Sequence, residues 1–259
     1  MADSTFDKLE IRYQTAMVVP PPYAHFFTII LRASADKRLT VELTMTYTDR
    51  DELEEDEIVA EGFTPNDDYQ WSGQLPAVWV QPVGDLVRKT QLKAFDEEKL
   101  TDNQEYFLVT IEQKPQGSRS GAPVQRTEWQ FLSQELIQAV FEISGKEKPF
   151  EATYVEIENG GRVEARLTAS FGQRETRLEI RRNNQNRSTT LPWKELNAMM
   201  EVFYGVDYNS EEALTAPPRK PGRYLNLGTP EWYEIGTAVV GDEGAVGKLR
   251  KLLTRLIQS

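Results

Sequence analysis

Strict alternation of hydrophobic and polar residues marks several short stretches of the chain, and this is the pattern of β-strands with one buried face. The alternation is clearest over residues 38–47, where apolar side chains alternate mostly with threonine and glutamate. Asn159-Gly160-Gly161, between two further stretches, predicts a hairpin turn. The strands predicted in this way cover residues 9–13, 25–31, 38–47, 106–111, 151–157, 162–169, 174–182 and 233–240.

Apolar residues spaced three or four positions apart predict helices at residues 134–143, 192–204 and 245–257. A polar turn at 183–187 should precede the middle helix, and a hydroxyl from residues 188–190 should cap it. The buried stripe expected on this helix is Trp193, Leu196, Met200 and Phe203. The last helix carries the stripe Leu249, Leu252, Leu253 and Leu256 beside an exposed basic face of Lys248, Arg250, Lys251 and Arg255.

Three other segments have weaker patterns. The acidic run at 51–57 fits either a short solvated helix or a loop, and residues 116–121 are predicted to form a flexible loop. Leu75-Pro76 resembles the later Leu191-Pro192. A helix after Leu75-Pro76 would, however, contain Pro82 and Gly84, which we expect to interrupt it.

Hairpin-connected strands with helices between them predict an α+β fold, built from antiparallel sheets that are each followed by a packed helix. A sequence echo at an offset of 60 residues, in which Leu136 and Gly145 match Leu196 and Gly205, favours internal repeats. The polar stretch 96–104 and the proline-rich stretch 216–222 are candidate boundaries. The expected domains are a sheet-plus-helix unit at 1–98, a repeated strand/helix unit at 99–208, and a linker with an amphipathic helix at 209–259.

The composition of the 259 residues, with 27% charged and 39% hydrophobic side chains, is typical of a soluble globular protein. No apolar run is long enough to span a bilayer, and the first residues lack a secretion signal. The absence of cysteine excludes disulfides and thiolate chemistry. These features predict a cytoplasmic location and no association with a membrane.

The net charge of −11 is distributed unevenly along the chain. Residues 49–68 hold ten acidic side chains and one base, Arg50, whereas residues 162–187 hold seven arginines and three glutamates. The overall charge opposes non-specific attraction to nucleic acid or to anionic membranes. The sequence therefore predicts a locally basic surface on an acidic protein.

Motifs for catalysis or metal binding are incomplete. The glycine-rich stretch 241–248 has a glycine spacing one residue too long for a phosphate-binding loop, and Leu249 replaces the required hydroxyl residue. Counted from Asp49, Glu54 occupies the position where a calcium loop needs glycine. His25 is the only histidine and lies in an apolar strand, which favours a core or rim position. We therefore predict no metal site, no cofactor and no enzymatic activity.

The arginines of two predicted strands are the main candidates for ligand contacts. Even spacing places Arg162 and Arg166, and likewise Arg177 and Arg181, on one face of their strands. Glutamates fall on the same faces, so cross-strand ion pairs are the alternative interpretation.

A strand ending in arginines, a polar turn, Arg187-Ser-Thr-Thr-Leu-Pro192 and an amphipathic helix together resemble one repeat of the Pur and Whirly group. The resemblance covers about residues 151–205. It implies a four-stranded antiparallel sheet followed by a helix, with single-stranded nucleic acid bound across the sheet. It also implies that the backbone contacts are made by Arg166, Arg177, Arg181 and Arg182.

Two functions are compatible with these patterns. One is binding of single-stranded DNA or RNA on a basic sheet face with aromatic stacking. The other is a protein-interaction or scaffold module, whose acidic and basic surfaces recognise a partner or a second copy of the chain. Arginines that converge with exposed aromatics would favour the first function, and arginines held in ion pairs, beside an exposed apolar patch, would favour the second.

Overall fold

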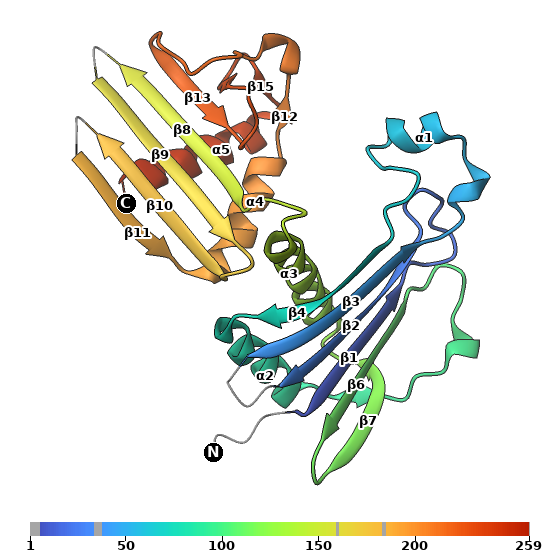
Figure 1. The fold of residues 1–259 in the computed structure, drawn as a ribbon. Helices are drawn as coiled ribbons and strands as arrows, with labels where there is room; N and C mark the ends of the chain where they lie inside the picture. The colour runs from blue at the N-terminus through green and yellow to red at the C-terminus, as the bar shows by residue number, and fades with distance from the viewer. Residues whose placement is uncertain (1–5, 34–37, 159–160, 183–184, 259) are drawn as a thin grey trace. The chain divides into compact units, whose positions relative to one another are not determined.

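The computed structural model describes residues 6–33, 38–158, 161–182 and 185–258, and Figure 1 shows its fold. The paired strands of its sheets run antiparallel, and helices accompany both large sheets. This confirms the predicted α+β class. In the ranges just given, no helix is long and apolar enough to cross a membrane.

The chain divides into two compact units, residues 1–147 (unit 1) and residues 148–259 (unit 2). This division differs from the predicted boundaries at 98/99 and 208/209, and strand pairing gives the reason. Strand β6 (Tyr106–Gln113) pairs with β1 (Lys8–Gln14), so residues beyond 99 belong to the first sheet. Strand β13 (Gly222–Asn226) pairs with β8 (Phe150–Glu158), so residues beyond 209 belong to the second sheet.

Unit 1 contains a seven-stranded sheet in the order β4-β3-β2-β1-β6-β7-β5. Strands β1 to β4 form a meander, and β6 pairs with the other edge of β1. The remaining strands are β2 (His25–Ala33), β3 (Leu39–Tyr47), β4 (Tyr69–Leu75), β5 (Leu92–Lys93) and β7 (Gly117–Pro123). The helices are α1 (Glu55–Ala60), α2 (Val80–Lys89) and α3 (Arg126–Ser144).

The core of unit 1 lies on the apolar face of this sheet, as the alternation predicts. Ile11, Ile29 and Val109 lie side by side in register and are almost completely buried. Helices α2 and α3 lie on this side of the sheet in Figure 1, and Trp129 and Leu136 of α3 are completely buried.

Two expectations for unit 1 are wrong. Residues 117–123 form strand β7, which pairs with β6, instead of a flexible loop. Pro82 and Gly84 lie inside α2 without interrupting it. Pro82 is tolerated because it is the third residue of the helix, where a backbone N–H would have no partner within the helix.

Unit 2 contains a six-stranded sheet in the order β11-β10-β9-β8-β13-β14 and a separate two-stranded pair, β12-β15. Strands β8 to β11 form a second four-stranded meander. The remaining strands are β9 (Gly161–Ser170), β10 (Glu175–Arg182), β11 (Gln185–Leu191), β12 (Asp207–Tyr208), β14 (Tyr233–Glu234) and β15 (Val239–Val240). The helices are α4 (Leu196–Tyr204) and α5 (Glu243–Gln258).

Three predictions for unit 2 concern turns and caps. The hairpin residues 159–160 and the start of the predicted polar turn, 183–184, lie outside the described residues, although β8 and β9 pair as expected. Residues 185–191 form strand β11 instead of continuing the turn, so the hydroxyls of residues 188–190 lie in the sheet and cap no helix. The predicted strand 233–240 is interrupted after Glu234, where Gly236 has a φ of 104°.

Helix α4 buries a different stripe from the predicted one. Leu196, Met199 and Phe203 are almost completely buried, whereas Met200 is only half-buried. A 3₁₀ turn at Trp193–Glu195 precedes the helix, and its tighter winding changes the angular position of Trp193 relative to the residues of α4. Trp193 remains partly exposed, with its ring 5.1 Å from that of Phe171.

Helix α5 agrees with the sequence prediction. Its four leucines, at positions 249, 252, 253 and 256, are buried. The basic residues predicted to stay in solvent are exposed. An amphipathic period of three and four residues was sufficient to identify both faces.

The two units have the same order of elements. Apart from α1, which lies within the meander of unit 1, and β15, which occurs in unit 2, each has a four-stranded meander, a 3₁₀ turn leading into a helix, a short strand, two further strands that extend the sheet beside the first meander strand, and a terminal helix. Helices α2 and α4 therefore hold corresponding places, as do α3 and α5. The offset of 60 residues in the sequence pairs α3 with α4, which hold different places in this order.

Candidate functional site

The predicted arginines lie mainly on the outer face of the unit 2 sheet, which is the face opposite the buried leucines and alanines of β9 and β10. Register places Glu179 beside Arg166, and Arg181 beside Glu164. Strand β8 adds Glu151 to this face, since Glu151 lies opposite Thr168. We call this surface the arginine face, and its charged residues are Arg162, Arg166, Arg177, Arg181, Glu151, Glu164, Glu175 and Glu179.

Carboxylates or amides bind every arginine of this face. Arg166 Nη2 donates to both carboxylate oxygens of Glu151 at 2.8 Å. Arg177 Nη2 lies 3.2 Å from Glu175 Oε1, and Arg162 Nη2 lies 3.0 Å from Glu164 Oε2. Arg181 Nε donates to the side-chain oxygen of Asn186 at 3.3 Å. Exposed pairs of this kind contribute little stability, about 0–1 kcal/mol each, but they balance the local charge.

Arg182 does not belong to this face. Successive side chains of a strand point to opposite sides, so Arg182 lies on the side of the sheet that carries Leu178 and Ile180. Its guanidinium donates to the carbonyl of Ile257 at 3.2 Å. This carbonyl lies in the last turn of α5, where a cation is favourable. Arg182 therefore tethers the C-terminal helix to the sheet.

The arginine face is electrically balanced, with four arginines and four glutamates. A shallow pocket of about 250 Å³ on it is lined chiefly by polar side chains, including Arg166, Glu179 and Arg181. Among the described side chains of β8 to β11 on this face, none is aromatic. The excess of arginine in residues 162–187 therefore does not become a concentrated basic surface on the sheet.

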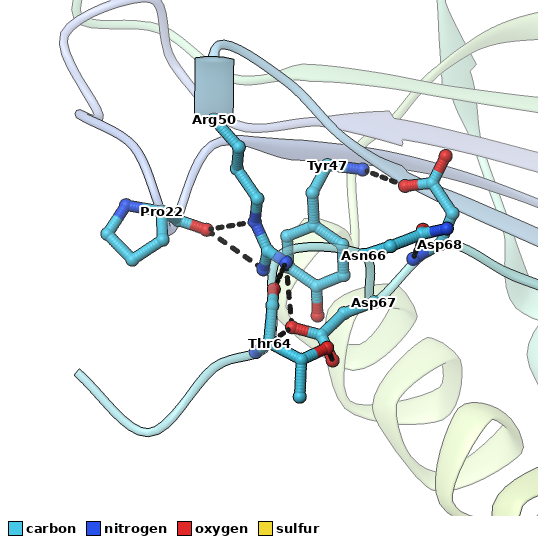
Figure 2. A network of polar contacts seen from close by, with 7 residues as sticks. All are labelled: Pro22, Tyr47, Arg50, Thr64, Asn66, Asp67 and Asp68. Atoms are coloured by element: carbon cyan, nitrogen blue, oxygen red, sulfur yellow. Dashed lines mark hydrogen bonds and ion pairs between the residues drawn. The ribbon is translucent and has the colours of Figure 1, made fainter. Parts of the chain in front are cut away.

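The acidic segment 49–68 is organised around its single base, Arg50 (Figure 2). The Arg50 side chain is only 7% exposed and donates to the carbonyl of Pro22 and to Asp67 at 2.7 Å. Its guanidinium also lies 4.0 Å from the centre of the Tyr47 ring. The segment thus has a defined structure that includes α1, and its other acidic residues from Asp51 to Glu61 are exposed.

Asp67 is the ionised partner in this cluster. Burial alone would raise the pKa of its carboxyl, but hydrogen bonds from Thr64 and the ion pair with Arg50 outweigh this effect and lower the pKa. Thr64 donates to Asp67 through both its hydroxyl, at 2.7 Å, and its backbone N–H, at 2.9 Å. These contacts favour a structural function for Asp67.

An aromatic pocket of about 320 Å³ opens in unit 1 between α3 and the ends of β1, β2 and β6. Tyr13, Phe27 and Phe107 are neighbours in register and form its floor. The ring of Tyr13 lies 5.0 Å from that of Phe27 and 6.0 Å from that of Phe107. Gln130, Phe131 and Gln134 of α3 form the opposite wall, and Phe131 is 49% exposed. Ligand pockets are of this size and combine aromatic walls with polar groups, which here include Glu105, Gln130 and Gln134.

A polar cluster closes one end of the aromatic pocket. The Glu105 carboxylate accepts hydrogen bonds from the Tyr13 hydroxyl, the Arg126 guanidinium and the Gln130 amide, each at 2.9 Å. Burial, with the hydrogen bond to Glu105, raises the pKa of Tyr13 well above its usual value. Tyr13 is therefore protonated at neutral pH, and the cluster acts as a fixed, satisfied rim for the pocket.

His25 lies at the rim of the same pocket, as the sequence predicted for a core or rim histidine. Its ring nitrogen Nδ1 is 2.8 Å from the carbonyl of Tyr23, and its ring lies 5.7 Å from that of Tyr13. Within the described ranges, no group of three or more potential ligands is arranged to hold a metal ion.

The glycine-rich stretch 241–248 begins helix α5. The Asp242 side chain accepts a hydrogen bond from the backbone N–H of Ala245 at 2.9 Å. This carboxylate therefore occupies the position at the start of the helix that a bound phosphate would need. The contact supports the interpretation of this stretch as a capping turn.

No protein-family model matches the chain, and no match was found among curated proteins or solved structures.

Sequence reasoning missed the aromatic pocket, although one signal was present. Phe131 lies off the buried helical stripe of Trp129, Leu132 and Leu136, so an exposed aromatic was readable from the spacing. The opposing wall was not readable, because it depends on the pairing of β1 with β6, which are about 100 positions apart. The single arginine among the ten acidic residues of the segment 49–68 was a similar signal for the Arg50 cluster, and sequence reasoning did not use it.

Proposed function

We propose that this chain is a non-enzymatic protein-binding module, in which the aromatic pocket of unit 1 takes an apolar anchor side chain from a partner. The observation that carries this proposal is the pocket itself. It places three aromatic rings opposite the half-exposed Phe131, and hydrogen bonds within the protein already satisfy its polar rim. Phe27 and Phe107 are already buried, so an apolar side chain would displace water chiefly from Tyr13 and Phe131, and the Glu105 cluster would keep its hydrogen bonds.

The charge of unit 1 indicates the flanking residues of such a partner. Unit 1 has 26 acidic and 14 basic residues, a net charge of −12. A field of this sign attracts basic segments and accelerates their association. The partner we propose is therefore a segment with an aromatic or long aliphatic anchor, flanked by lysine or arginine.

Single-stranded nucleic acid is the competing ligand. Its expected contacts were Arg166, Arg177, Arg181 and Arg182. Glutamates bind Arg166 and Arg177, the Asn186 amide binds Arg181, and Arg182 binds α5. Affinity for nucleic acid depends on cations that can replace counterions, and stacking needs exposed rings. The balanced arginine face and the open aromatic pocket together favour a protein partner.

A peptide-display selection on the immobilised protein tests this proposal. We expect enriched peptides to share an aromatic or aliphatic anchor with basic flanks. Replacing Phe131 by Asp should weaken their binding at least tenfold, about 1.4 kcal/mol, because it places a charge against the anchor. The 49% exposure of Phe131 makes the variant compatible with folding.

Phe26→Asp is the matched control. Phe26 is 37% exposed and lies next to Phe27 in β2, so its side chain points to the opposite face of the sheet. Peptide binding should survive this change. If the selected peptides bind the Phe131→Asp variant with the same affinity as the unaltered protein, the pocket is not the binding site. Failure to enrich any peptide, with tight binding of oligo(dT) or RNA, would favour the nucleic-acid hypothesis.

A further inference from the structure

Residues of helices α4 and α5 in unit 2 line an open groove of about 600 Å³. Its floor consists of Ala198, Met199 and Val202 from α4 and Leu252 from α5. Met199 and Leu252 are largely buried, Val202 is half-buried, and Ala198 is exposed. The apolar floor thus extends from the core out to solvent.

The corresponding seam of unit 1 is closed. Helices α2 and α3 hold the same places in their unit as α4 and α5, and Trp129 of α3 is completely buried there. Its indole N–H donates to the hydroxyl of Thr90, the residue that follows α2, at 2.9 Å. Lys89 and Glu128 form an ion pair across the same seam. The same order of elements is therefore compatible with a closed seam, and the open groove is a property of unit 2.

The rim of the unit 2 groove is basic. Lys248, Lys251 and Arg255 follow one face of α5 at intervals of three and four residues, and Lys194 contributes a fourth cation from the other side. Glu195 is the one acidic residue that lines the groove, and it lies 3.7 Å from Arg255. Within the described part of the chain, the ammonium groups of Lys194, Lys248 and Lys251 form no ion pair.

We infer that this groove binds an amphipathic helix from a partner protein, with an apolar stripe flanked by aspartate and glutamate. Helix-in-groove recognition uses anchors at intervals of three and four residues, and Ala198, Met199 and Val202 present that spacing on the groove floor. The three unpaired lysines supply charge complementarity to the acidic flanks. Residues 195–202 span about 10 Å along the helix axis, which is enough for about two turns of a bound helix.

Two synthetic helical peptides test this inference. They share one leucine stripe, and its flanking positions are glutamate in one peptide and lysine in the other. Fluorescence anisotropy with the full chain should detect binding of the glutamate peptide, weakening as salt rises, and no binding of the lysine peptide. Equal affinities for the two peptides would overturn the inference, since the basic rim would then have no effect.

Three variants locate the binding. Val202→Asp places a charge on the apolar floor and should weaken binding of the glutamate peptide at least tenfold. Lys251→Glu reverses one rim charge at an exposed position, where folding tolerates it, and should weaken binding severalfold. Lys220→Glu makes the same change in a loop that does not line the groove and should leave affinity unchanged. Phe131→Asp should also have no effect, which separates this site from the aromatic pocket.

Two results would contradict the proposed partner. If Val202→Asp and Lys251→Glu both keep their affinity for the glutamate peptide, with unchanged melting temperatures, the groove is excluded as the binding site. The protein could instead form a dimer that Lys251→Glu dissociates, and show no affinity for the glutamate peptide. That result would assign the groove to a second copy of the chain.

Discussion

At the scale of single residues, the structure depends on charges that find specific partners. Arg50 is nearly buried within the most acidic stretch of the chain, and it binds two other segments, one at Pro22 and one that contains both Thr64 and Asp67 (Figure 2). The cation lies against aromatic rings as well as a carboxylate, so both electrostatics and packing hold it. A segment rich in acid can fold in this way because one cation offsets repulsion at its centre.

Replacing Asp67 by Asn should reduce the stability of unit 1 by about 1–3 kcal/mol at pH 7, because Arg50 loses an ionised hydrogen-bond partner. The pKa of Asp67 is lowered in the folded state, so the unfolded chain takes up the proton first as pH falls. The stabilisation is therefore complete above the ordinary carboxyl pKa of about 3.9 and is lost below it. Urea unfolding at pH 7 and at pH 3 measures this difference.

Asp51→Asn is the control, because Asp51 is exposed in the same segment. Its effect should stay within about 0.5 kcal/mol at both pH values. Two results would show that the ion pair does not organise the segment. In one, Asp67→Asn is as stable as the unaltered protein at pH 7. In the other, the difference in unfolding free energy between the two proteins grows on acidification.

The alternation of Arg177 and Arg181 was readable from the sequence, and so was the opposite orientation of Arg182. Their partners were only partly readable. Glu175 is two positions from Arg177 on the same strand. Glu151 binds Arg166 because β8 and β9 pair in one particular register, and a shift by one residue would move it to the other face. The charge balance of the arginine face could not be derived without that register.

At the scale of elements, periodicity identified the strong helices and strands and was less accurate for the short helix α4 and the polar strand β11. The leucine stripe of α5 is buried as predicted, because the helix is long and regular. In α4 the buried methionine is Met199 instead of Met200. The two are adjacent and flank the line through Leu196 and Phe203, so the spacing alone did not separate them. Strand β11 escaped prediction because its residues Gln185 to Thr190 are polar throughout, so no alternation marks an edge strand that faces water.

Adjacent methionines provide a direct test of the phase of α4. Met199→Ala should cost about 2–5 kcal/mol, since its side chain is 1% exposed and the change leaves a cavity. Met200→Ala should cost much less, because its side chain is only half-buried. Denaturant unfolding of both variants measures the two costs. A larger cost for Met200→Ala would mean that the predicted stripe is correct.

At the scale of the whole molecule, two units with the same order of elements differ in charge and in their open surfaces. Unit 1 has a net charge of −12 and an aromatic pocket, whereas unit 2 has 15 acidic and 16 basic residues and a basic groove. The shared order was hidden from sequence reasoning, because it depends on pairings between distant strands, such as β1 with β6 and β8 with β13. The offset of 60 residues reflected a common amphipathic period instead of a shared place in the fold.

The central claim is that the chain binds protein segments through the aromatic pocket, while the arginine face is a balanced surface. An NMR titration of the isotope-labelled chain, with a peptide obtained by display and separately with oligo(dT) at low salt, tests both parts together. The peptide should shift the resonances of Tyr13, Phe107 and Gln134, and oligo(dT) should shift none. Shifts caused by oligo(dT) at Arg166, Arg177 and Arg181, with no peptide-induced shifts at the pocket, would contradict the account.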